Sequence, residues 1–176
     1  MNILKNQAKV LSFVICLGFC SSGYCRADAG REAAAPTMTL FYRGEARAVP
    51  QDSAEAKKLE KETMDLLGTM RHIVLKAFPD TENTLKQQGV CLEISFAKST
   101  LIKSSPEGKP ILWVLKAIIP LEGRSVGIDT FEGNVTVQYV FQEKGQRASS
   151  GPFGTTVSTS EIKKILQRMS LLPYKD

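Results

Sequence analysis

The strongest pattern in the chain is a set of apolar or small residues at helical spacing between residues 56 and 77. These residues recur at steps of three and four, and they are Ala56, Leu59, Thr63, Leu66, Met70, Ile73 and Ala77. The opposite side carries Lys58, Lys61, Asp65, His72 and Lys76. This pattern predicts one amphipathic helix with a single buried side. Such a helix needs a broad apolar partner surface, and a β-sheet provides one.

Capping and breaking residues set the limits of this predicted helix. Asp52 and Glu55 can cap the start, because a carboxylate accepts hydrogen bonds from the free N–H groups of a first turn. Pro79 ends the pattern, because the proline ring disfavours helical geometry in Phe78 before it. A helix between these limits is roughly 40 Å long at 1.5 Å per residue. Residues 80–89 are then expected to be a polar connection.

Strands are predicted on both sides of this helix. In the segment that starts at Val90, apolar and polar residues alternate, which is typical of a strand with one buried face. The segment 111–119 is almost wholly apolar and rich in β-branched residues, so we expect a central strand buried on both faces. The strands expected in all are 38–42, which 46–49 could extend, and 90–97, 111–119, 125–131 and 135–141.

The order of these elements predicts the fold class. Ser158 and Glu161 form a capping box before a short apolar stripe, so a last short helix is expected there. We therefore predict an α+β fold, with a long N-terminal helix packed on a mostly antiparallel sheet of about five strands and a short C-terminal helix. The helices are expected mainly on one face of the sheet. Residues 37–176 are expected to form one globular domain, preceded by a flexible leader, 30–36.

The first 29 residues have the pattern of a secretory signal peptide. Lys5 and Lys9 precede an apolar core of ten residues, 10–19. A helix that spans a bilayer needs about 20 apolar residues, so this core is too short for a stable transmembrane anchor. The small residues Ala27 and Ala29 suit a cleavage site, with the cut expected after Ala29 and Ala27 as the close alternative. The protein is therefore expected in a bacterial periplasm or outside the cell.

Lipid attachment is the alternative interpretation of this N-terminus. It requires a cysteine preceded by small residues, and the three N-terminal cysteines follow Ile15, Phe19 and Tyr24 instead. This sequence context disfavours a lipoprotein.

The net charge gives little reason to expect nucleic-acid binding. The chain has 23 Lys and Arg and 18 Asp and Glu, a formal charge of +5. Residues 1–29 carry three basic residues and one acidic residue, a net of +2, which leaves +3 for the mature chain. A charge of that size is ordinary for solubility. No basic stripe interleaved with aromatic residues is present, so a nucleic-acid partner is not expected.

Cys91 and His72 are the candidates for a thiol nucleophile and its base. That chemistry needs the two side chains within hydrogen-bond reach of each other. The predicted elements place them on surfaces that point apart, so a dyad is disfavoured. Cys91 is expected to be a small residue in a second packing layer, with an exposed thiol that oxidises or links two chains as the alternative. His72 is expected on the solvated helix face.

Paired carboxylates and metal sites were the other catalytic possibilities. Glu93, with Asp129 or Glu132, could supply two acids for a hydrolase, but no spacing selects this pair. A single histidine supplies too few ligands for a typical metal site. The sequence also contains no phosphate-binding, haem or dinucleotide motif. We therefore expect no cofactor and no metal.

The loop around residue 153 is the candidate partner-binding segment. It contains Ser149, Ser150, Gly151, Pro152 and Phe153. An exposed Phe153 could anchor a partner, and the alternative is a Phe153 that packs inward while the loop wraps an edge strand. Separately, residues 134–136 match an N-glycosylation acceptor, which matters only in a eukaryote.

These observations lead to a functional expectation rather than to a reaction. We expect an exported, non-enzymatic binding or accessory domain of unknown ligand. Such a domain could be an inhibitor or a module that binds a protein or a small ligand. The alternatives are a small carboxylate-dependent hydrolase and a structural envelope protein that dimerises through an edge strand.

Overall fold

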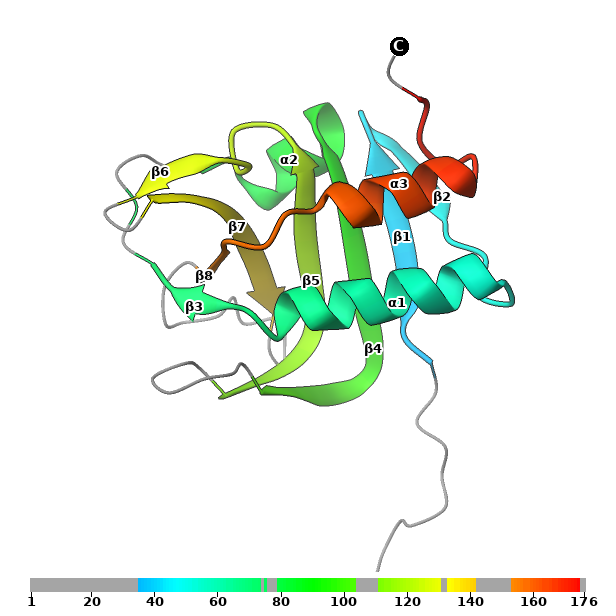
Figure 1. Cartoon of the computed structure of the whole chain (residues 1–176), viewed down its shortest axis with the longest axis horizontal. Helices are drawn as coiled ribbons and strands as arrows, with labels where there is room; N and C mark the ends of the chain where they lie inside the picture. Colours follow the sequence, from blue (N-terminus) through cyan, green and yellow to red (C-terminus); the bar gives the residue numbers. More distant parts are fainter. Residues whose placement is uncertain are drawn as a thin grey trace, which may run out of the picture. The chain divides into compact units, whose positions relative to one another are not determined.

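One antiparallel β-sheet organises the part of the chain that the computed structural model describes (Figure 1). That part comprises residues 35–73, 75, 79–103, 111–130, 133–141 and 153–174, all within the structural unit 33–176. The sheet order is β2-β1-β4-β5-β7-β8-β3, and β6 pairs with β7. The strands are β1 (Thr37–Tyr42), β2 (Glu45–Ala48), β3 (Arg71–His72), β4 (Val90–Lys103), β5 (Ile111–Glu122), β6 (Ile128–Thr130), β7 (Gly133–Phe141) and β8 (Phe153–Thr155).

Helices cover both faces of this sheet. Helices α1 (Ala54–Leu67) and α3 (Ser160–Arg168) cross one face, in front of β1, β4 and β5 in Figure 1. Helix α2 (Glu82–Gln88) lies on the other face. Alternate residues of β4 show this division, because Leu92 packs with α1 and α3 whereas Cys91 packs with Leu85 of α2.

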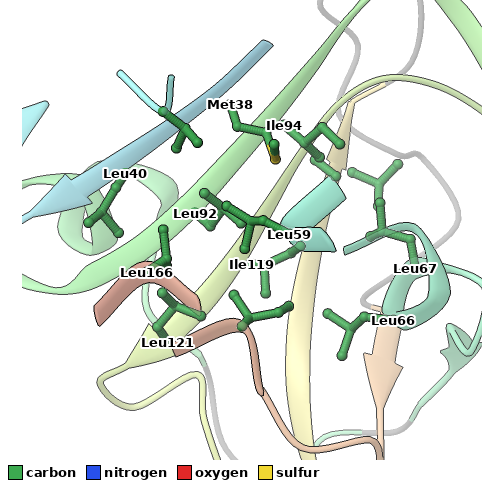
Figure 2. Packing of buried hydrophobic residues seen from close by; sticks show 14 of the residues in the cluster. Met38, Leu40, Leu59, Leu66, Leu67, Leu92, Ile94, Ile119, Leu121 and Leu166 are labelled. Carbon is green, nitrogen blue, oxygen red and sulfur yellow. The ribbon is translucent and has the colours of Figure 1, made fainter. Parts of the chain in front are cut away.

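The main core lies between the sheet and the pair α1 and α3. Leu59 of α1 and Leu166 of α3 meet Leu92 of β4 and Ile119 of β5 there (Figure 2). All four side chains are fully buried. Burial of one such side chain is worth roughly 1.5–3 kcal/mol, so this layer is the main source of stability.

The prediction of a long N-terminal helix on a sheet of about five strands is wrong. Helix α1 ends at Leu67, where the N–H of Gly68 closes the last turn on the carbonyl of Met64. The Thr69 hydroxyl then donates to the carbonyl of Leu66 at 2.7 Å. Glycine is about 1 kcal/mol poorer than alanine inside a helix, and a threonine hydroxyl that bonds backwards competes with the helical ladder.

The apolar spacing continues past Gly68 although the helix ends there. Met70 is fully buried in the main core, and Ile73 is buried in a second cluster against β7. Both residues follow the helix in an extended segment that includes β3, which pairs with β8. The spacing of buried residues therefore matched a helix although the backbone had changed to a strand.

The sequence also missed helix α2, which lies in the predicted polar connection 80–89. Its only buried residue is Leu85, so it has no apolar stripe to detect. The Thr81 hydroxyl caps its start by accepting from the N–H of Thr84 at 3.2 Å. Among the described helices, α1 and α3 share one face of the sheet and the short α2 lies on the other.

The sheet has eight strands because short strands extend its two edges. The segment 46–49 is not an extension of β1, because Arg43 and Gly44 form a tight turn after which β2 runs back along β1. The pair β3 and β8 builds the other edge. The prediction for 111–119 holds at Ile118 and Ile119, which are buried on opposite faces, and fails at Trp113, which is exposed.

Candidate functional site

The cysteine and the histidine lie far apart in the sheet. Cys91 is on β4, fully buried, and packs with Leu85 and Ile118. His72 is exposed on the edge strand β3, where its ring centroid is 5.1 Å from that of Phe153. Strands β5, β7 and β8 lie between β4 and β3. The two side chains therefore cannot form a nucleophile and base pair in this structure.

Burial determines the chemistry of the Cys91 thiol. Loss of solvent disfavours the charged thiolate and raises the pKa of Cys91 to about 12. The residue therefore packs inside the protein, as the second-layer interpretation predicts. The alternative of an exposed, oxidisable thiol is wrong for Cys91.

Glu93 belongs to a network of four alternating charges beneath α2, which we call the α2 ion-pair network. The Lys86 ammonium lies 2.6 Å from the Glu93 carboxylate and 3.0 Å from that of Glu82. The Lys116 ammonium lies 3.0 Å from Glu82 and 3.5 Å from Glu93. All four side chains are partly buried, and each charge lies beside two opposite charges.

Two aromatic rings complete this network. The ammonium of Lys86 lies 4.7 Å from the centre of the Phe41 ring, and that of Lys116 lies 4.3 Å from the centre of Phe141. These distances are in the range of cation–π attraction. The network therefore fixes α2 onto β4 and β5, and this gives Glu93 a structural role.

The structure does not bring Asp129, one of the two other candidate acids, to Glu93. Asp129 lies on β6, and strands β5 and β7 stand between β6 and β4. Glu132 lies outside the described residues. Among the residues that are described, no group of three or more His, Cys, Asp or Glu is placed to hold a metal ion.

The α2 ion-pair network should make stability depend on pH at both extremes. Burial alone would raise the pKa of Glu82, but hydrogen bonds from Lys86 and Lys116 outweigh burial and lower that pKa below 4.5. Likewise burial alone would lower the pKa of Lys86, but Glu93 and Glu82 outweigh it and raise that pKa above 10.5. The contribution of Glu82 is therefore complete above pH 4.5 and decreases as the pH falls through the folded pKa. That of Lys86 is complete below pH 10.5 and decreases as the pH rises.

Urea unfolding of the wild type and of Glu82→Gln at a series of pH values tests this dependence. We expect the free energy of unfolding of the wild type to fall as the pH drops below 4.5. The variant should show a shallower fall, because it lacks the carboxylate that must be protonated. An unchanged pH dependence in Glu82→Gln would contradict the assignment.

The candidate partner-binding loop is described only at its last residue. Phe153 lies on β8 between β7 and β3, and its side chain is 1% exposed within the main core. Ser149, Ser150, Gly151 and Pro152 lie outside the described residues. A role for those four residues stays a prediction, and Phe153 is not accessible as an anchor. Asn134, in the predicted glycosylation motif, is exposed near the start of β7.

An exposed tryptophan lies on a part of the sheet that sequence reasoning took to be buried. We call residues 100–103 of β4 and 111–114 of β5 the arm; they follow a register shift between Ser95 and Thr100. One face of the arm is buried in the main core through Ile102, Leu112 and Val114. Trp113, on the other face, is 57% exposed and pairs in register with the half-buried Leu101.

A hollow lies between the β1–β2 hairpin and the chain that follows α3. Its volume is about 550 Å³. A second hollow of about 230 Å³ adjoins it, sharing Tyr42, Gln167, Leu172 and Pro173. The larger is completed by Arg47, Ser170 and Tyr174, and the smaller by Arg43, Glu122 and Lys163. We refer to both together as the α3 hollow. Sequence reasoning missed it because its walls come from opposite ends of the domain.

Comparisons with known proteins add no relative. No family model matches the chain, no curated protein matches it, and no solved structure matches its fold. Among the described residues, no helix is both long enough and apolar enough to cross a membrane.

Proposed function

We propose that this protein is an exported, non-enzymatic binding or accessory domain that holds a protein partner on the outer face of its arm. The observation that carries the proposal is the exposure of Trp113. Tryptophan is the residue most enriched where binding energy concentrates in protein interfaces. Here it stands on a regular strand pair whose opposite face is anchored in the core.

The surroundings of Trp113 support this role. Leu101 is the register partner of Trp113, so a second apolar side chain lies beside the ring. Among the described residues, Leu101 belongs to none of the three hydrophobic clusters. Lys103 is exposed on the same face, because it also alternates with the buried Ile102. An apolar centre with a charged rim is the usual anatomy of a protein interface. The export part of the proposal rests on the N-terminal sequence pattern.

Site-specific photo-crosslinking tests this proposal. A photoreactive phenylalanine analogue replaces Trp113 in the full chain. A matched variant carries it at Val157, which is also exposed but belongs to the segment between β8 and α3 rather than to the arm. After irradiation in the native compartment, we expect a discrete protein adduct from position 113 and none from position 157. Trp113→Ala should abolish copurification of the same partner. Adducts that are equal at both positions, or absent from both, would refute the proposal.

A further inference from the structure

The α3 hollow combines cations, aromatic rings and a fixed backbone. Its volume of about 550 Å³ falls in the range of small-molecule sites, which are about 300–1,000 Å³. Tyr42, Leu172, Pro173 and Tyr174 provide apolar surface, and Tyr174 is 69% exposed at the rim. The Gln167 amide donates to the carbonyl of Pro173 at 3.3 Å, which ties the last described residues to the helix.

The walls of the hollow are held in place by Arg47. One nitrogen of its guanidinium donates to the carbonyl of Leu171 at 2.7 Å. The other donates to the carboxylate of Glu45 at 2.6 Å. The same guanidinium carbon lies 5.1 Å from the centre of the Tyr42 ring. Arg47 thus joins the hairpin to the chain after α3, and it is a structural element of the hollow.

Strained backbone gathers at this one place. Arg43 and Ser170 are the non-glycine residues with positive φ in the described ranges, at 50° and 57°, and both line the hollow. A left-handed conformation costs roughly 1–2 kcal/mol for a residue with a side chain. Ser170 sits where a helix usually ends in glycine, since Leu171 N–H bonds to the carbonyl of Leu166 there. Strain of this kind is concentrated at functional sites.

Among the described residues, two cations at the hollow have no carboxylate partner. Within the described part of the chain, the Arg43 guanidinium lies 5.4 Å from the centre of the Tyr42 ring, and neither Arg43 nor Lys163 takes part in an ion pair. The neighbouring Lys164 differs, because it lies 3.7 Å from the Glu161 carboxylate. Glu122 is the acidic residue in the lining and has an interaction of its own. Three cations therefore face one lining carboxylate, and Arg47 is already neutralised by Glu45.

We infer that the α3 hollow binds a small organic anion, with its ring or apolar body against Tyr42, Pro173 and Tyr174 and its charged end at Arg43 and Lys163. A guanidinium and an ammonium group both donate charge-assisted hydrogen bonds to carboxylate and phosphate oxygens. The aromatic and proline surfaces suit a flat apolar group. This site shares no residue with the arm, so the inference does not depend on the proposed function.

Calorimetric titration of the full chain with three probes tests the ligand class. Benzoate and phenyl phosphate carry the expected anionic groups, and benzyl alcohol carries the same ring without a charge. We expect both anions to bind at least about tenfold more tightly than benzyl alcohol, because a hydrogen bond to a charged group contributes that much. The tighter of the two anions identifies carboxylate or phosphate as the natural charged group. No binding by either anion, or equal binding by the alcohol, would overturn the inference.

Two adjacent lysines of α3 provide matched variants. Lys163→Met should weaken the binding of the tighter anion about tenfold, because it removes a charged donor from the hollow. Lys164→Met removes the same charge one residue away and should change that affinity less than about twofold. Thermal unfolding of both variants checks that they are folded, and Trp113→Ala should bind the anion as the wild type does. Equal weakening by the two lysine substitutions would show only non-specific charge attraction and would refute the site.

Discussion

Phe153→Ala is expected to lower the free energy of unfolding by about 3–5 kcal/mol. The Phe153 ring is 1% exposed and belongs to the main core. Strand β8 has only three residues and is held between β7 and β3, so the backbone cannot collapse into the cavity that alanine leaves. The cost therefore combines lost apolar burial with an unfilled cavity. Urea denaturation monitored by circular dichroism measures it.

Trp113→Ala is the matched control for this substitution. It also removes a large aromatic side chain from a strand, but the ring of Trp113 is 57% exposed. Its free energy of unfolding should stay within about 0.5 kcal/mol of the wild type, as for most surface substitutions. Similar losses in both variants would contradict the burial that the structure assigns to Phe153.

The contrast between these two aromatic residues shows a limit of sequence reasoning. Phe153 follows Pro152 and precedes Gly154, a context that favours a loop. The structure gives Gly154 a packing role instead, because a Cβ there would lie 2.8 Å from the Ile73 side chain. Trp113 lies in an apolar run that predicts burial on both faces. Its exposure depends on which elements cover that face of the sheet, and no local pattern encodes this.

Strands could be predicted where every second side chain along the strand faces the core. Val90, Leu92 and Ile94 are all buried in the main core, and β4 begins at Val90 as the alternation predicts. The long helix failed because spacing alone does not tell a helix from a helix followed by a strand. The decisive residues were Gly68 and Thr69, which close the last turn of α1. Their individual preferences are weak beside an apolar stripe, so the pattern outweighed them.

The candidate sites were harder to predict than the strands. The α3 hollow depends on the hairpin turn at Arg43 and on the left-handed Ser170, which lie far apart in the sequence. The α2 ion-pair network likewise joins β4 and β5 to a helix that has a single buried residue. Glu93 could be selected from the sequence as a strand carboxylate, but its two lysine partners could not.

Alkylation of Cys91 by iodoacetamide at pH 8 is expected to be about a thousandfold slower in the native protein than in concentrated urea. The pKa of the buried thiol rises from 9.0 to about 12, so the thiolate fraction at that pH falls by about three orders of magnitude. The thiol is also fully covered, since its exposed fraction is zero. Labelling of the peptide that contains Cys91, followed by mass spectrometry, separates this residue from the three N-terminal cysteines.

The urea dependence of this labelling identifies the motion that exposes Cys91. Leu85 of α2 and Ile118 of β5 cover the thiol, and the α2 ion-pair network holds α2 in place. If α2 opens alone, the labelling rate depends weakly on urea. Leu85→Ala then accelerates labelling by more than its effect on the free energy of global unfolding would account for. If only global unfolding exposes the thiol, the labelling rate follows the unfolded fraction. Native labelling as fast as in concentrated urea would contradict the burial of Cys91, and with it the packing of α2 against the sheet.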